Sequence, residues 1–218
     1  MRYPLKNIFS ITVPLFILSA GSAWADLNDD ISKLQHRWAD ANYQLYEKAQ
    51  LSTFETLVSD SEQLVATHPK SADALVWSGI IKSTYAGAKG GLGALSLAKK
   101  AKTDLEQALG IDPEALNGSA YTSLGTLYFN VPGWPIGFGS DKKAEELLLK
   151  ALAINPDGLD TNYFFGDYLI HEKRYQEARI YLLKAKGASP RPDRPLADAG
   201  RQKEITQALA IVDQKLGD

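Results

Sequence analysis

The chain has 218 residues, 44% of them hydrophobic and 23% charged, with a formal net charge of −2, as in a single globular domain. It has no basic excess and no polybasic block, which argues against nucleic acid and anionic lipid as partners. It contains no cysteine, which excludes disulfides, thiolate metal sites, a cysteine nucleophile and lipidation of an N-terminal cysteine.

Residues 1–25 have the pattern of a secretory signal peptide. Two basic residues precede a mostly apolar segment at 8–18, and Ala-Trp-Ala at 23–25 places small residues where signal peptidase reads them. An uncleaved membrane anchor is the alternative, but the apolar segment is about half the length of a span and contains Pro14. We therefore expect cleavage after Ala25, no remaining membrane span, and a periplasmic or secreted product.

Residues 26–218 are expected to form one helical domain, because helical periodicity dominates and prolines and glycines fall between the apolar runs. Residues 26–69 are predicted to form a degenerate first hairpin with helices at 27–49 and 52–67.

Residues 70–190 contain three similar units, each with a helix of the pattern Ala-x3-Leu-x2-Ala followed five residues later by proline. The triplets are Ala101, Leu105 and Ala108; Ala144, Leu148 and Ala151; and Ala178, Leu182 and Ala185, which precede Pro113, Pro156 and Pro190. This spacing puts each triplet on one helical face, where the alanines let a neighbouring helix approach closely. The proline prevents the helix from continuing into the next unit.

A second helix precedes each of these helices. Its pattern is Tyr121-x2-Leu124-Gly125-x2-Tyr128 in one unit, Asn162-x2-Phe165-Gly166-x2-Leu169 in the next, and looser around Gly79. A glycine inside a helix costs about 1 kcal/mol relative to alanine, so we expect these glycines where two helices are in close contact.

Together the two helices resemble the 34-residue tetratricopeptide repeat (TPR). The resemblance implies an all-α fold in which antiparallel helix hairpins stack as a right-handed solenoid. It also implies a capping helix in residues 191–218, and the apolar stripe there predicts a helix at 195–216.

Two of the units exceed the repeat length by roughly ten and seven residues, and the extra residues fall at 85–95 and 129–140. Stacked repeats are in register, so both insertions should emerge on one edge of the solenoid. The glycine-rich 87–93 segment is predicted to be a flexible turn, because it lacks the Gly-Lys-Ser/Thr ending and preceding strand of a phosphate loop.

The second insertion is unusually apolar for a surface loop. It carries the candidate binding residues Phe129, Val131, Trp134, Ile136 and Phe138. Two interpretations stay open: the loop folds back as core, or it lines a binding site; the two are compatible.

In many TPR proteins the first helix of each repeat lines a concave groove, and some of these grooves hold a terminal carboxylate with lysines and asparagines. The matching positions here are Asp73, Val76, Ile80 and Ser83; Ser119, Thr122 and Thr126; and Asp160, Tyr163 and Asp167. None is basic, so we expect an apolar, polar-neutral or basic ligand.

The histidines His36, His68 and His171 have no metal-ligand spacing, and no catalytic signature is present. The sequence therefore predicts no enzyme, no cofactor and no metal site.

The overall plan also resembles the periplasmic T-component of TRAP-type transporters, in which degenerate TPRs enclose a cavity or pore and associate with a substrate-binding protein. Many members carry the lipidated cysteine that this chain lacks. Two hypotheses remain: a periplasmic adaptor that binds another protein, and an accessory that binds a small apolar ligand. Neither predicts an oligomeric state.

Overall fold

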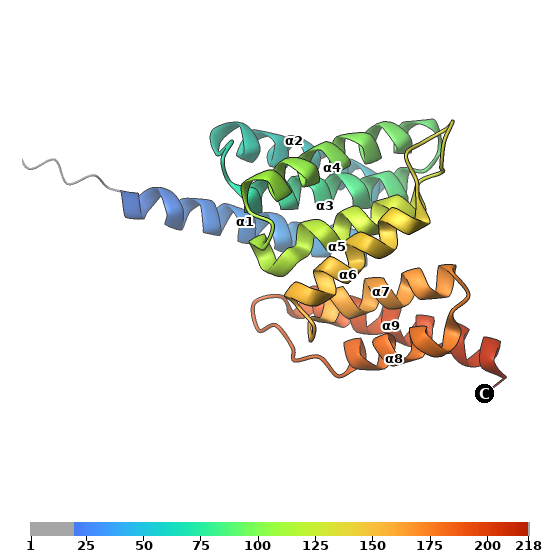
Figure 1. The fold of residues 1–218 in the computed structure, drawn as a ribbon. Helices are drawn as coiled ribbons and strands as arrows, with labels where there is room; N and C mark the ends of the chain where they lie inside the picture. The colour runs from blue at the N-terminus through green and yellow to red at the C-terminus, as the bar shows by residue number, and fades with distance from the viewer. Residues whose placement is uncertain (1–19, 218) are drawn as a thin grey trace, which may run out of the picture.

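The computed structural model describes residues 20–217, and this part of the chain consists of helices and short connections (Figure 1). The helices are α1 (Ala20–Tyr43), α2 (Glu47–Thr67), α3 (Ala72–Lys89), α4 (Gly91–Ile111), α5 (Ala115–Asn130), α6 (Asp141–Ile154), α7 (Leu159–His171), α8 (Tyr175–Lys186) and α9 (Pro195–Leu216). Most of the predicted signal peptide lies outside the described residues, and cleavage after Ala25 stays a prediction. Within residues 20–217 no helix is both long and apolar enough to cross a membrane.

Consecutive helices pack as pairs, most closely α3 with α4, α5 with α6, and α7 with α8. Figure 1 shows the pairs stacked one after another, with α2 at one end and α8 and α9 at the other. The predicted all-α fold of stacked helix hairpins is confirmed.

The repeated triplets form the interior of these pairs. All nine alanines and leucines are fully buried: Ala101, Leu105, Ala108, Ala144, Leu148, Ala151, Ala178, Leu182 and Ala185. The leucine of each triplet lies against the interior glycine of the partner helix. A Cβ added to Gly79, Gly125 or Gly166 would lie 2.6, 2.8 or 2.8 Å from the Cγ of that leucine. The expectation that these glycines permit close helix contact is confirmed.

The first hairpin turns earlier than predicted. α1 ends at Tyr43 and α2 begins at Glu47, so the predicted break near residues 50 and 51 is wrong. Tyr46, the residue before α2, has extended backbone angles (φ −135°, ψ 157°), and no proline or glycine marks this position in the sequence.

The turn predicted in the 87–93 segment is present but much shorter than expected, because the 85–95 insertion is almost entirely helical. Only Gly90 separates α3 from α4, and the extra residues lengthen both helices. Gly90 and Gly91 have φ values of 60° and 62°, which reverse the chain within two residues at a conformation that glycine adopts without strain.

The second insertion does form a loop, at residues 131–140. The backbone N–H of Ser140 donates to the Tyr128 carbonyl at 2.8 Å, and the N–H of Gly139 donates to the Pro132 carbonyl at 3.0 Å. A Cβ on Gly137 would lie 3.4 Å from Leu95 Cδ1 of α4. Figure 1 shows the loop beside the turn between α3 and α4, so the two insertions share one edge, as expected.

The last helix returns to the first. α9 begins with Pro195 in its first turn, where the closing helix was predicted, and it packs against α8, α7 and α1. The His36 Nε2 of α1 lies 2.9 Å from the Asp193 carbonyl oxygen, and a Cβ on Gly200 would lie 2.4 Å from the Tyr43 ring. This contact joins the C-terminal half of α1 to the beginning of α9.

Candidate functional site

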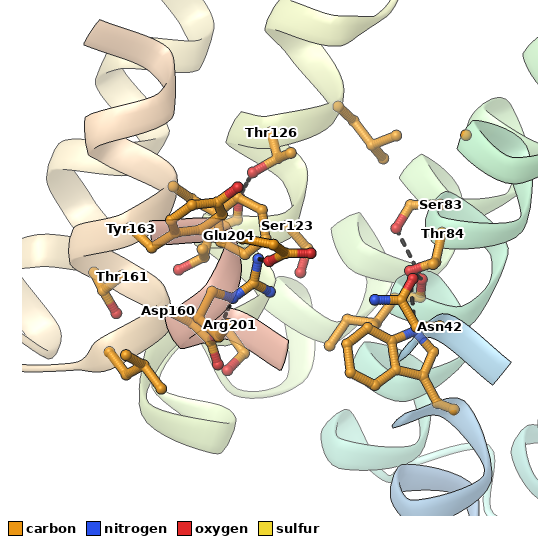
Figure 2. Close-up of a pocket in the computed structure, with 18 of the residues that line it drawn as sticks. Asn42, Ser83, Thr84, Ser123, Thr126, Asp160, Thr161, Tyr163, Arg201 and Glu204 are labelled. Carbon is orange, nitrogen blue, oxygen red and sulfur yellow. Dashed lines mark hydrogen bonds and ion pairs between the residues drawn. The ribbon is translucent and has the colours of Figure 1, made fainter. Parts of the chain in front are cut away.

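A cavity of about 1540 Å³ lies among the helix pairs. Its walls come from α3, α5 and α7, the first helices of the three pairs, from the first turns of α4, and from α1, α9 and the segment before α9. The 131–140 loop and the connection between α6 and α7 also contribute lining residues. Figure 2 shows Asn42, Ser83 and Thr84 on one side, and Asp160, Tyr163 and Arg201 on the other. Small-molecule pockets usually measure about 300–1,000 Å³, so this cavity has room for a larger ligand.

Most of the predicted groove residues line this cavity. They are Ile80, Ser83, Ser119, Thr122, Thr126, Asp160 and Tyr163. Asp73, Val76 and Asp167 are not among the lining residues. Val76 is fully buried in the core cluster that contains Ala120 and Leu124 of α5. Its placement in the groove was therefore wrong, because this turn of α3 is packed inside the core, whereas Ile80, one turn later, lines the cavity.

Neutral hydroxyl groups form much of the wall. The Ser83 hydroxyl donates to the Ile80 carbonyl at 2.9 Å, and the Thr126 hydroxyl donates to the Thr122 carbonyl at 2.8 Å. Thr84 donates to the same Ile80 carbonyl and accepts from the Trp38 indole at 3.0 Å. Because their hydrogens are used within the helix, Ser83 and Thr126 offer the cavity oxygen acceptors.

An ion network occupies the α9 side of the cavity. Arg201 is 7% exposed, and its Nε donates to Asp160 Oδ1 at 2.8 Å while Nη1 pairs with Glu204. Its guanidinium carbon also lies 4.4 Å from the ring centroids of both Tyr163 and Phe164. Burial alone would raise the pKa of Asp160, but the attraction of Arg201 and of a second arginine outweighs burial and holds it well below its usual value.

The second arginine is Arg191, in the segment before α9. Its Nη1 donates to Asp160 Oδ2 at 2.7 Å, and its Nε donates to Asp198 Oδ1 at 2.7 Å. Asp198 is 8% exposed and also accepts from the Arg191 backbone N–H at 2.6 Å. These contacts attach the closing segment to α7.

Arginines from outside the repeats therefore line the cavity. The groove positions on the first helices of the repeats carry no basic residue, as the sequence showed, but the cavity as a whole does contain basic side chains. The sequence contained one indication of this arrangement. Arg201 lies four residues before Ile205 and four after Ala197, both buried, so it interrupts the apolar face of α9.

The candidate loop residues divide into two groups. Phe129 is 9% exposed and packs against Tyr168, with ring centroids 5.7 Å apart, while Phe138 lies 5.4 Å from the Tyr128 ring. Trp134 and Ile136 are exposed. Val131 and Ile136 line the cavity, and Trp134 is not among the lining residues. The core interpretation therefore applies to Phe129 and Phe138, and a binding role for Val131 and Ile136 stays a prediction.

The structure also brings Asp141, His171 and Glu172 together on the surface, with one potential ligand atom of each within 4.8 Å of the others. All three side chains are exposed, and His171 Nε2 lies 3.4 Å from Asp141 Oδ1, as in a surface ion pair. We assign no metal site to this cluster.

Comparison with known proteins identifies the repeat. Residues 159–192, which contain α7 and α8, match the tetratricopeptide repeat family model. The chain contains a tetratricopeptide repeat. A thermophilic TPR protein from Thermus thermophilus superposes with a TM-score of 0.56 at 16% sequence identity, covering 84% of this chain and 99% of that chain.

Two crystal structures of MamA cover 86% and 79% of this chain, and 92% and 97% of their own, at 17% and 18% identity, with TM-scores of 0.44 and 0.45. No curated protein sequence gave a significant match. The likeness to the Thermus protein shows a TPR-like fold. The comparisons give no support to the resemblance to the T-component of TRAP-type transporters.

Proposed function

We propose that this protein is an exported, non-catalytic TPR scaffold whose cavity binds an extended segment of a periplasmic partner protein. The observation that carries the proposal is the cavity itself: about 1540 Å³, bordered by the first helix of every pair, and larger than most small-molecule pockets.

The chemistry of the walls suits an extended peptide. Such a peptide presents a backbone N–H and a carbonyl at nearly every residue, and each needs a partner when it leaves water. Ser83 and Thr126 supply acceptors, and the Asn42 amide can both donate and accept. Ile80 and Phe164 add apolar surface for side chains.

Site-specific photo-crosslinking tests this proposal with a matched pair of glycines. Gly87 lines the cavity and Gly110 does not, and a Cβ at either would have open space around it. A photoreactive phenylalanine at Gly87 should give a specific adduct in cells, identified by mass spectrometry, and none should form from Gly110. An absence of adducts at Gly87, or the same adducts at both positions, would contradict the proposal.

Export is a separate part of the proposal and rests on the pattern of residues 1–25. Removing them leaves 22 basic and 26 acidic residues, a net charge of −4. Cell fractionation and N-terminal sequencing should find a periplasmic or secreted form that begins at Asp26. A product that keeps Met1 and stays in the cytoplasm would disprove export.

A small-ligand accessory is the second candidate, because α9 packs against α1 and both helices add walls to the cavity beside those of the repeats. Native mass spectrometry of the purified protein distinguishes the two. A bound small molecule that leaves on denaturation would favour the accessory function.

A further inference from the structure

We infer that the cavity contains a carboxylate-binding subsite formed by Arg194 and Trp77. This inference rests on the proposed function, since it names the chemical group that the cavity recognises. The subsite is built from α3 and the residue before α9, not from lysines on the first helices of the repeats.

Arg194 and Trp77 form a stacked pair in the cavity wall. The guanidinium carbon lies 5.1 Å from the indole centroid, and both side chains line the cavity. An aromatic face holds the planar guanidinium in place, so the arginine loses less side-chain entropy when it binds an anion.

Both members of the pair have a buried N–H without an acceptor. Trp77 is 3% exposed, and neither its Nε1 nor the Arg194 Nε has a hydrogen-bond partner in residues 20–217. Buried donors are nearly always satisfied, and an unsatisfied one destabilises the folded protein. Both of these atoms are covered, so a ligand in the cavity does not reach them. The terminal nitrogens of Arg194, Nη1 and Nη2, are not covered and form no hydrogen bond or ion pair within residues 20–217, so they are the donors that a ligand can meet.

The nearby carboxylates attract Arg194 but none pairs with it. Asp160 is occupied by Arg201 and Arg191, Asp198 is occupied by Arg191, and Asp193 acts on Arg194 without forming an ion pair with it. Within the described residues Arg194 forms no ion pair. Burial, and then repulsion by Arg191, lower the pKa of Arg194. Because an arginine pKa begins far above neutrality, the side chain still carries its charge.

A carboxylate matches these donors best. Its two oxygens accept from the guanidinium, and charge-assisted hydrogen bonds of this kind are shorter and about twice as strong as neutral ones. The expectation of a neutral or basic ligand is thereby revised. The carboxylate can belong to a partner segment or to a free organic acid, and the test separates these sources.

The test uses the full-length protein with ¹⁵N-labelled tryptophan and arginine side chains. The probes are N-acetyl-trialanine with a free carboxylate, the same peptide as its C-terminal amide, and sodium succinate. We expect saturable shifts of the Trp77 Nε1 and Arg194 Nε resonances with carboxylates and none with the amide. Binding of the peptide acid alone assigns the group to a partner, and binding of succinate alone assigns it to a free acid. Equal binding of acid and amide, or no saturable shift, would overturn the inference.

Three variants separate recognition from structure. Arg194→Gln should weaken carboxylate binding by about tenfold or more. Trp77→Phe, which puts a smaller and weaker π surface under the guanidinium, should weaken it by about threefold. Arg37→Gln is the charge-matched control, because Arg37 pairs with Asp60 outside the cavity lining, and it should bind like the wild type. Because Trp77 is buried, Trp77→Phe should also lower the melting temperature, so its affinity is measured at a temperature where both proteins are folded. A variant that loses stability but not affinity would refute the subsite.

Failure of the subsite and failure of the proposed function give different results. If the Gly87 adduct forms in both the wild type and Arg194→Gln, and no carboxylate shifts the two resonances, the subsite is wrong and the scaffold function stands. If carboxylates bind but Gly87 gives no adduct, the subsite stands as a small-acid site and the scaffold function is wrong.

Discussion

Replacing Gly125 with alanine should destabilise the protein, although alanine favours helices more than glycine does. Gly125 faces α6, and a Cβ there would lie 2.8 Å from Leu148 Cγ and 3.2 Å from the Ala144 carbonyl oxygen. Carbon atoms in contact are normally about 3.5–4.0 Å apart, so either the helices must separate or Leu148 must leave its rotamer. Leu148 is fully buried among other core side chains, so a change of rotamer would disturb their packing.

The size of the effect follows from two opposing terms. Alanine gains about 1 kcal/mol of helix propensity over glycine. Overpacking a closely packed core costs about 1–3 kcal/mol, and a methyl group that meets both a buried side chain and a backbone carbonyl belongs at the upper end. The expected net loss is about 2 kcal/mol of the free energy of unfolding.

Urea unfolding followed by circular dichroism measures this loss, with Gly110→Ala as the control. Gly110 lies near the end of α4, and a Cβ there would meet nothing within 4 Å. That variant should match or exceed wild-type stability by up to about 0.5 kcal/mol, because only the propensity term acts near the helix end. If Gly125→Ala were as stable as Gly110→Ala, the steric explanation of the repeat glycines would be refuted. Adding Leu148→Ala should remove the clash, so the two changes should not be additive.

Further predictions concern the attachment of α9 and the apolar loop. Asp160→Asn should lower the free energy of unfolding at pH 7 by about 3 kcal/mol, because it leaves the buried Arg201 with a single carboxylate partner. An unchanged free energy would show that Glu204 alone is enough to compensate the charge of Arg201. The folded state holds the Asp160 pKa below its ordinary value of about 4, so this stabilisation is present above that pH and lost as the pH falls below it. The difference between wild type and Asp160→Asn in urea unfolding should therefore shrink from about pH 5 to about pH 3; a constant difference would exclude the ion pair as its cause. Trp134→Ala should change stability by less than about 0.5 kcal/mol, because the side chain is 89% exposed, whereas Phe129→Ala should cost about 3 kcal/mol. Similar losses in both variants, measured by thermal unfolding, would show that the whole loop is core.

The helix pairs were predictable because the information that specifies them is local. Ala144, Leu148 and Ala151 lie on one face at helical spacing, and Pro156 prevents the helix from continuing. Boundaries without such markers were missed. The turn at Tyr46 has no proline or glycine, and Gly90 alone reverses the chain where a longer flexible turn was expected.

The cavity was predictable only in part. Ile80, Thr122, Thr126 and Tyr163 were identified as lining because they repeat at matching positions of successive units. Val76 lies one helical turn before Ile80 on the same face of α3, yet it is fully buried in the core. Spacing along one helix identifies a face but does not show where a neighbouring helix begins to cover that face.

By itself the sequence determined the all-α fold, the repeated helix contacts and the first helices as walls of a groove. Only the tertiary structure showed that α9 packs against α1 and that Arg194 stacks on Trp77. It also showed that Arg201 pairs with Asp160, although the two residues are 41 positions apart in the sequence. Helical periodicity specifies which side of each helix is buried. The meeting of distant helices depends on small rotations that accumulate from one pair to the next, and these follow from the packing of the whole chain.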